Sequence, residues 1–223
     1  FKGYKPQKAV NIGYGIQAPP YTKEIAKPLF LERFPEFKGK EYWLFLSRIH
    51  PKKGLDLLIQ AYKRLVEKQV ALPILLIAGP GLNTAFGKQL RRDALGLPIH
   101  FVGMLENELK WGALYGAKHF ILPSYQENFG IAVVEALACA TPVVISDQVN
   151  IWREIKKAGA GVICKTTVDS LEQSLRTLLF SNKEEEQTAR KDAYACYRHN
   201  FLIDNVSSRF KSILTQELNI NDN

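Results

Sequence analysis

From residue 42 onward, short runs of apolar residues alternate with longer segments in which apolar residues recur at helical spacing. Each short run predicts a strand and each longer segment predicts a helix. In the segment 54–69, for example, Leu55, Leu58 and Ile59 fall on one helical face. The predicted strands are 42–47, 73–79, 99–103, 119–124, 141–147 and 161–165. The predicted helices are 54–69, 83–95, 106–117, 124–140, 168–180, 183–199 and 204–218.

This alternation of strand and helix predicts right-handed βαβ units and a parallel sheet. The strand segments are continuous apolar runs, which is typical of strands covered by helices on both faces. We therefore expect an α/β fold with a doubly wound, Rossmann-like parallel sheet. Residues 1 to about 40 contain five prolines and no sustained periodicity, so they predict an extended lead-in with a short helix near 26–33.

Composition narrows the class of protein. At 46% hydrophobic residues, the 223-residue chain can bury a core, and its apolar runs are too short to cross a membrane. Three cysteines without a CxxC pair indicate packing thiols in a reduced, cytosolic protein. The net charge of +8 fits nucleic acid, an anionic membrane surface or a phosphorylated small molecule, and it does not choose among them.

In a doubly wound sheet, ligands bind beyond the carboxyl ends of the strands. The loops that follow these ends here are rich in glycine and in small polar or charged residues, whereas the opposite connections are plainer. These loops are 47–54, 78–81, 102–106, 123–130 and 146–150. One edge of the sheet is therefore the expected ligand site.

The loop 47–54 places Arg48 after a strand and Lys53 before a helix. Two cations beside the free N–H groups of a helix start would suit a diphosphate. Taken alone, Lys53 is better read as a solvated surface residue, and His50 as a turn residue. The chain has no GxGxxG and no GxxxxGK[ST] motif, so neither a dinucleotide fingerprint nor a P-loop is expected.

The segment 124–140 carries a second candidate feature. We expect Phe129, Gly130 and Ile131 to form the first turn of a helix, whose N–H groups could support a phosphate. Glu135 lies in a stretch of this helix that is apolar on all sides and so predicted to be buried. It is either half of a structural ion pair or an acceptor for ligand hydroxyls, with even weight. Glu127, at the strand end, reads by itself as a solvated carboxylate.

Together, three blocks resemble the carboxyl-terminal domain of a retaining glycosyltransferase of the GT-B fold, family 4. The first is SYQENFGIAVVEALACATPVVISD, in which seven residues separate Glu127 from Glu135. The second, LSRIHPKKGLDLLIQAY, matches an Arg-x4-Lys-Gly loop through Arg48, Lys53 and Gly54. The third is IAGPG followed by HFVGMLENELK. The resemblance covers residues 42 to about 160.

The resemblance implies a nucleotide-diphospho-sugar as donor, with a UDP-sugar favoured and a GDP-sugar second. It implies that Arg48 and Lys53 stabilise the leaving diphosphate, that Glu127 holds sugar hydroxyls near the anomeric carbon, and that the three act as the catalytic set. Further implied donor contacts are Asn128, the backbone at Phe129, Gly130 and Ile131, and Glu135 toward the ribose. The base would stack on Gly103, Met104 and Leu105, with Lys110 a weaker candidate. Neither a metal nor another cofactor is implied.

Several residues depart from the family pattern. Ser47 and Asn128 stand where glycine is common, and both touch the implied donor site. Ala140 replaces a glycine in the segment after the helix, and Tyr14 replaces an asparagine in the linker-like 11–16. The first two substitutions could alter sugar preference, whereas the other two look structural.

Length is the largest departure, because family members carry an amino-terminal domain that makes most acceptor contacts. We therefore expect residues 1–22 to be a linker remnant from a missing amino-terminal domain, 23–203 the donor-binding domain, and 204–223 a carboxyl-terminal helix and tail. Alone, such a chain should bind donor but transfer little. The full-length protein would transfer sugar to a saccharide or lipid-linked acceptor in polysaccharide or glycoconjugate synthesis.

Other functions stay open on the sequence. The chain could be a non-catalytic nucleotide-sugar-binding module or a nucleotide-sugar epimerase of the same fold, although the Arg-x4-Lys-Gly block favours transfer. An RNA-binding domain rests on net charge alone, and no nucleic-acid partner is expected. We expect a cytoplasmic location. Peripheral contact at the cytoplasmic membrane face would depend on the missing half.

Overall fold

The computed structural model describes residues 10, 12–68 and 70–218. Its strands are β1 (Tyr42–Leu46), β2 (Ile74–Ala78), β3 (Ile99–Gly103), β4 (His119–Leu122), β5 (Val143–Ser146) and β6 (Gly161–Cys164). Its helices are α1 (Lys23–Arg33), α2 (Leu55–Glu67), α3 (Ala85–Asp93), α4 (Asn107–Gly116), α5 (Ile131–Ala138), α6 (Trp152–Lys157), α7 (Val168–Leu178), α8 (Lys183–Cys196) and α9 (Ile203–Leu218). The predicted strands are therefore all present, each within its expected range.

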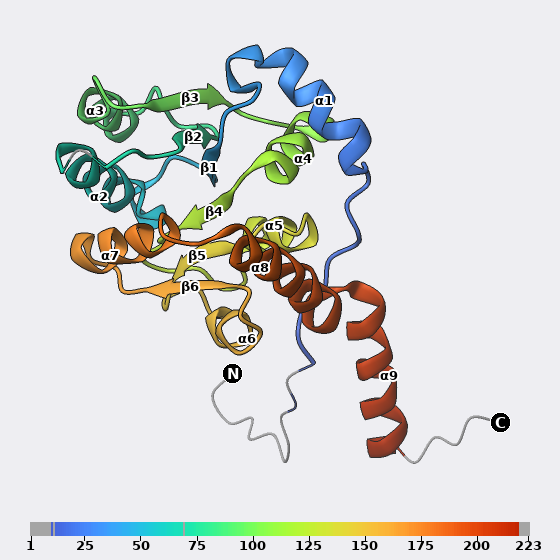
Figure 1. Ribbon diagram of the computed structural model, residues 1–223. Coiled ribbons are helices and arrows are strands. Elements are labelled where there is room, and N and C mark those ends of the chain that lie inside the picture. Colours follow the sequence, from blue (N-terminus) through green and yellow to red (C-terminus); the bar gives the residue numbers. More distant parts are fainter. Residues whose placement is uncertain (1–9, 11, 69, 219–223) are drawn as a thin grey trace.

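The strands form one six-stranded sheet in the order β3-β2-β1-β4-β5-β6. Every neighbouring pair is parallel, and the β1 pairing runs from Tyr42 opposite Ile74 to Leu46 opposite Ala78. The order reverses direction between β1 and β4, so the chain winds outward both ways from the middle of the sheet (Figure 1). This confirms the doubly wound, Rossmann-like fold. The reversal between β1 and β4 is the point at which sheets of this kind bind ligands, beyond the carboxyl ends of the two strands.

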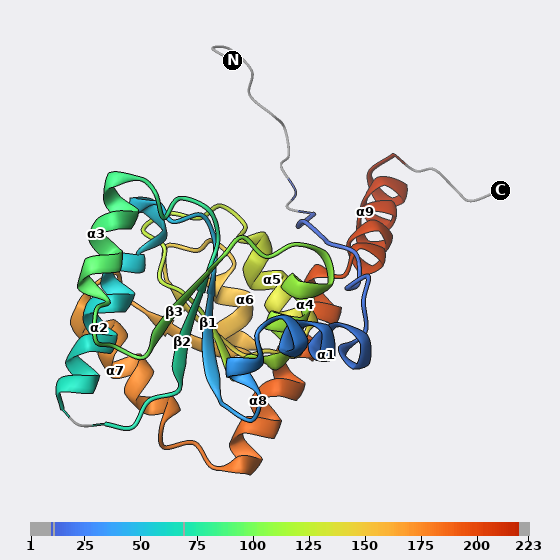
Figure 2. The same cartoon turned by 90° about the horizontal axis from the view of Figure 1, so that it is seen from above.

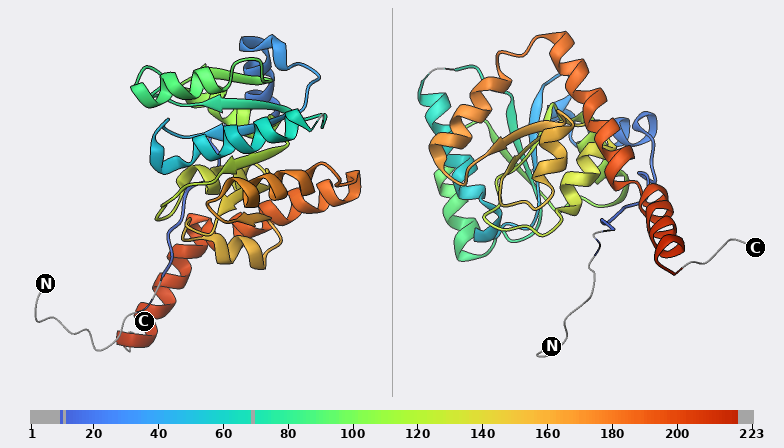
Figure 3. Two further views of the ribbon diagram at one scale, coloured as in Figure 1. Left: turned by 90° about the vertical axis from the view of Figure 1, so that its left-hand side faces the viewer. Right: turned by 90° about the horizontal axis from the view of Figure 1, so that it is seen from below.

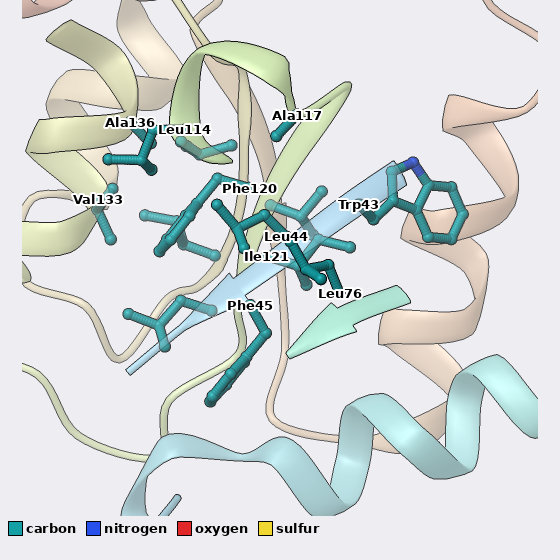
Figure 4. Close-up of a cluster of buried hydrophobic side chains, with 14 of the residues drawn as sticks. Trp43, Leu44, Phe45, Leu76, Leu114, Ala117, Phe120, Ile121, Val133 and Ala136 are labelled. Atoms are coloured by element: carbon teal, nitrogen blue, oxygen red, sulfur yellow. The ribbon is translucent and has the colours of Figure 1, made fainter. Parts of the chain in front are cut away.

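Helices cover both faces of the sheet. One face carries α2, α3 and α7, and the other carries α1, α4 and α5 (Figures 1 and 2). The apolar strands are buried between these layers, as at Leu44, Phe120 and Ile121, which are 0% exposed (Figure 4). Burial of such side chains, at roughly 25 cal/mol per Å² of apolar surface, is the main stabilisation of the sheet sandwich.

The carboxyl-terminal part ties the chain ends together. Helix α8 packs against α5 and α6, and a π-helical turn (Tyr197–Phe201) leads from it into α9. The amide of Ile16 donates to the carbonyl of Phe201 (2.8 Å), and the amide of Ile203 donates to the carbonyl of Ile16 (3.1 Å). From this junction α9 projects away from the body (Figure 3).

The local structure differs from the sequence predictions at two places. The helix expected over 124–140 begins only at Ile131, because Gly130 adopts a left-handed conformation (φ 73°) that interrupts helical geometry. Phe129 and Gly130 therefore precede the first turn rather than form it. The six-residue helix α6 was not expected, because it is too short to show a periodic pattern.

Other expectations about individual groups hold. All three cysteines, Cys139, Cys164 and Cys196, are buried free thiols. The helix near 26–33 is present as α1. Within the part of the chain that the structure describes, no helix has the length and apolar character needed to cross a membrane. Residues 1–9 and 11 of the expected linker lie outside the described residues, and the expected domain boundaries stay a prediction.

Candidate functional site

The loop after β1 is a compact turn that brings a lysine to the edge of the sheet. Pro51–Lys53 forms a single 3-10 turn, and the ring Nδ1 of His50 accepts a hydrogen bond from the backbone N–H of Lys52 (3.2 Å). His50 is thus a turn-capping residue, as the sequence indicated. Gly54 follows with φ 68°, and a Cβ at this position would come within 2.1 Å of the Pro123 carbonyl oxygen. Only glycine allows the loop to pack this closely on the end of β4.

The loop between β4 and α5 is anchored to both neighbouring loops. The amide of Tyr125 donates to the carbonyl of Lys52 (2.9 Å). On its other side, the amide of Glu127 donates to the carbonyl of Gln148 (3.1 Å), and the amide of Asn150 donates to the carbonyl of Glu127 (3.0 Å). The backbone of Glu127 is therefore held in place between the loops that follow β1 and β5.

These two loops bring Lys53 and Glu127 into direct contact. The ammonium group of Lys53 forms an ion pair with Oε2 of Glu127, and only 16% and 20% of the two side chains are exposed. The interpretation of each as a solvated surface residue is therefore wrong. Their spacing of 74 residues is spanned because β1 and β4 are adjacent in the sheet.

The ion pair borders a hollow of about 410 Å³ at the carboxyl edge of the sheet. Its lining is polar, with three cationic side chains and Glu127 as the one carboxylate among the residues that line it. The lining residues are Arg48, His50, Lys52, Lys53, Gln126, Glu127 and Asn128. An anionic group with oxygen acceptors fits this chemistry.

The start of α5 lies beside this hollow. Gly130 is its N-cap, and Ile131, the first helical residue, is 52% exposed. The first N–H groups of a helix lack intrahelical acceptors and carry partial positive charge, so this end favours an anion. The ring of Phe129 is engaged elsewhere, in edge contacts with Tyr14 (4.7 Å) and Phe201 (5.9 Å) between ring centroids. Its ring therefore holds the loop against the chain ends, which leaves only its backbone for the site.

Glu135 follows Ile131 by one helical turn on the same face of α5. Its Oε1 accepts from Nζ of Lys110 on α4 at 2.8 Å, and the two side chains are 14% and 24% exposed. The same ammonium lies 4.5 Å from the ring centroid of Trp111. The expectation of a helix buried on all sides is wrong, because Ile131, Ala132 and Glu135 lie on a partly open face. Of the two readings of Glu135, the structure contains the ion pair.

The expected base-stacking segment lies at the end of β3, two strands from β1. Gly103 is exposed with φ 76°, and the Met104 side chain is 62% exposed. The Leu105 side chain is 7% exposed and belongs to the hydrophobic core. Gly103 and the side chain of Met104 are therefore available to a planar ring, whereas the side chain of Leu105 is not.

The structure groups the candidate residues into three sets. Arg48, Lys53, Glu127 and Asn128 share the hollow, whereas Lys110 and Glu135 form a second pair between α4 and α5. The segment 103–105, at the end of β3, is not among the residues that line the hollow. Sequence reasoning named neither Gln126 nor Lys52 as a site residue, although both line the hollow. Their position beside named residues in the two loops was the available signal. Among the described residues, no group of three or more His, Cys, Asp or Glu side chains is placed to hold a metal ion.

Comparison with known proteins places this geometry in a family context. A family model described as "Glycosyl transferases group 1" matches residues 27–195. Among curated proteins, a D-inositol 3-phosphate glycosyltransferase of Kineococcus radiotolerans is 28% identical over 195 residues, covering 79% of this chain and 45% of that protein. A GDP-mannose-dependent alpha-(1-6)-phosphatidylinositol dimannoside mannosyltransferase of Mycobacterium tuberculosis (strain H37Ra) is 33% identical over 134 residues, covering 60% and 34%.

Solved structures show the same fold. A glycosyltransferase from Rickettsia africae superposes with a TM-score of 0.76 at 17% identity, covering 95% of this chain and 58% of that one. Anabaena HepE, solved with UDP and glucose, gives a TM-score of 0.73 at 18% identity, covering 92% and 55%. The chain thus spans less than half the length of the two curated relatives described above and somewhat more than half of these two structures.

Proposed function

Because the chain belongs to the glycosyl transferases group 1 family, we propose that it binds a nucleotide-diphospho-sugar at the carboxyl edge of its sheet. The observation that carries the proposal is the hollow between the ends of β1 and β4, where Arg48 and Lys53 meet Glu127 and Asn128. A diphosphate joined to a sugar presents both an anion and hydroxyl groups, and this hollow offers cations and acceptors side by side.

Each residue then has a distinct role. Arg48 and Lys53 neutralise the diphosphate, and the start of α5 at Gly130 and Ile131 adds backbone N–H groups. Glu127 accepts from sugar hydroxyls. As the glycosidic bond breaks, negative charge grows on the leaving diphosphate, so the same two cations stabilise the transition state more than the ground state.

The nucleoside would extend away from this hollow. Glu135 accepts from ribose hydroxyls, exchanging the contact that it makes with Lys110, and the base lies against Gly103 and Met104. We favour a UDP-sugar as donor, with a GDP-sugar second. Because the name of the mycobacterial relative states a dependence on GDP-mannose, a test must include both UDP-sugars and GDP-sugars. Retention at the anomeric carbon, as in family 4, and chemistry without a metal follow from the resemblance of the motifs.

Transfer is proposed for a longer protein. The chain spans 45% and 34% of the two curated relatives described above, so residues that would bind the acceptor are expected outside it. A saccharide or lipid-linked acceptor is the proposed partner, and a cytoplasmic location with peripheral membrane contact is proposed for the whole protein. By itself the chain would act as a donor-binding module, because transfer requires both substrates held in one geometry.

Calorimetric titration with UDP-, GDP- and ADP-sugars tests the proposal. We expect saturable binding of at least one donor, and a loss of at least about tenfold in affinity in Lys53→Ala, since one charge contact to phosphate is worth roughly 1.5–3 kcal/mol. The matched control is Lys40→Ala, which removes an exposed lysine outside the hollow and should bind normally. A folded sample that binds no member of the panel would contradict the proposal.

A further inference from the structure

In this structure Glu127 is already paired with Lys53, the cation that is proposed to bind the diphosphate. Its carboxylate is paired with the ammonium group of Lys53, and both side chains are largely shielded from solvent. A phosphate oxygen can bind Lys53 closely only by replacing this carboxylate or by sharing the ammonium with it. The family motif therefore contains its own competitor for the ligand.

The exchange must be made by the side chains. The backbone of Glu127 is held by hydrogen bonds with Gln148 and Asn150, and the turn that carries Lys53 is held through the contact between Tyr125 and Lys52. Gly54 packs directly on Pro123, which prevents the two loops from separating without a larger rearrangement. Glu127 therefore stays at the border of the hollow when its partner is taken, and its charge stays with it.

A carboxylate left beside a diphosphate is unfavourable, since the two like charges lie within a few ångströms at a partly shielded site. Arg48 and Lys52 line the same hollow, but the ion pair that the structure gives Glu127 is with Lys53. The carboxylate needs hydrogen-bond donors in place of Lys53. A nucleoside diphosphate has no donor at this end, whereas a sugar attached to the distal phosphate brings several hydroxyl groups.

We propose that Glu127 is a specificity-determining residue that selects the sugar-bearing nucleotide over the free nucleoside diphosphate. The inference rests on the proposed function. It adds that Glu127 favours binding of the sugar conjugate and opposes binding of the free diphosphate. With sugar present, hydroxyls replace Lys53 as partners of the carboxylate, and Lys53 is released to the phosphates. Once the sugar has been transferred, those hydroxyls are gone, Glu127 recovers Lys53, and the diphosphate is displaced.

The test measures two affinities by calorimetry, for a nucleoside diphosphate and for its sugar conjugate, using UDP with UDP-glucose and GDP with GDP-mannose. In Glu127→Gln the charge is removed at constant shape. We expect the affinity for the nucleoside diphosphate to rise by about tenfold, the scale of one like charge near a protein surface. The preference for the sugar conjugate over the diphosphate should fall by at least the same factor.

Two control variants isolate the cause. Glu36→Gln removes one exposed carboxylate outside the hollow and should leave both affinities unchanged. Glu135→Gln alters a residue proposed to meet the ribose, which both ligands share, so it should weaken both and keep their ratio. If Glu127→Gln binds the diphosphate no more tightly than the unmodified chain, the inference is overturned. If the unmodified chain binds neither ligand, the proposed function fails instead.

A second experiment uses the unmodified chain and tests the same inference if Glu127→Gln does not fold. The unmodified chain is titrated with UDP or GDP in the presence and absence of saturating free glucose or mannose. Because free hexose can supply the hydroxyls that Glu127 lacks, we expect the diphosphate to bind more tightly when the hexose is present. Equal affinity with and without hexose would contradict the role given to Glu127.

Discussion

Arg190 on α8 donates a 3.2 Å hydrogen bond to the carbonyl oxygen of Ala140, a residue whose φ of 54° lies in the left-handed region. Ala140 follows the C-cap of α5 and completes a Schellman motif. The amide of Ala140 donates to the carbonyl of Leu137 (3.0 Å), and the amide of Thr141 donates to the carbonyl of Ala136 (2.9 Å). Glycine is preferred at this position because it has no Cβ to strain.

Ala140→Gly should therefore stabilise the chain. Relief of left-handed strain gains about 1–2 kcal/mol, and the added freedom of the unfolded chain takes back about 0.5–1 kcal/mol. The expected net gain of roughly 0.5–1 kcal/mol is measured by urea unfolding. Ala138→Gly, in helical geometry two residues earlier, is the control and should lose about 1 kcal/mol. A loss of stability in Ala140→Gly would show that the methyl group contributes more than its strain costs.

His119 predicts a specific acid sensitivity of folding. Its side chain is buried at the start of β4, and burial, with the charges of Arg190 and Lys118, lowers its pKa from 6.5 to about 3. The folded state therefore keeps the ring neutral while the unfolded state takes up a proton below pH 6.5. The stability that the chain gains from keeping His119 neutral is fully present above pH 6.5. It is lost as the pH falls toward 3, at up to about 1.4 kcal/mol of unfolding free energy per pH unit.

Urea unfolding at pH 7 and pH 5 measures this effect. The unmodified chain should lose about 2 kcal/mol more between these two values than His119→Leu, which has no ring to protonate. His100→Gln alters an exposed histidine and should keep the dependence of the unmodified chain. Equal losses in the unmodified chain and in His119→Leu would show that His119 is not the group responsible.

Gly54 predicts a link between stability and the geometry of the hollow. In Gly54→Ala the new methyl group meets both a left-handed backbone and the Pro123 carbonyl, so the loop carrying Lys53 must shift away from Glu127. Gly39→Ala is a matched control, since Gly39 has φ 71° and no neighbouring atom within 4 Å of an added Cβ. Gly39→Ala should therefore lose only about 1–2 kcal/mol of stability, the cost of a left-handed backbone at a residue with a Cβ.

The comparison uses urea unfolding and donor titration together. Gly54→Ala should lose more stability than Gly39→Ala and should also weaken donor binding, whereas Gly39→Ala should leave binding unchanged. If the two variants lost the same stability and bound donor equally well, the close contact between Gly54 and Pro123 would have no role in holding the site.

The sequence predicted the sheet well because each strand is a continuous apolar run bounded by turn residues, as at 73–79 and 119–124. It also predicted that the loops after β1 and β4 would meet at one edge, where the structure has the polar hollow, because a doubly wound sheet brings these loops together. The order and spacing of residues in the sequence could not show which side chains form ion pairs with one another. Taken alone, Lys53 and Glu127 were interpreted as solvated, and the family resemblance placed both in the site without pairing them. Their contact, and the contact of Glu135 with Lys110, are known only from the fold.

The late start of α5 had a different cause. The apolar run after Gly130 predicts a helix but does not specify where it begins, and the left-handed backbone of Gly130 becomes visible only with the loop contacts around Glu127. Short elements such as α6 carry too few residues for periodicity to identify. The start of α5 thus depends on the loop around Glu127, whereas α6 was missed because of its length.

A nucleotide sugar is proposed to bind in the hollow between the loops 47–54 and 123–131. The most direct test is a titration of the 15N-labelled chain with the donor that binds best, followed by amide chemical shifts. We expect the largest shifts in these two loops, including the amides of Lys53, Glu127 and Ile131, and we expect them to be lost in Lys53→Ala. Saturable binding whose shifts fall outside these loops, and which persists in Lys53→Ala, would contradict the assignment of the site.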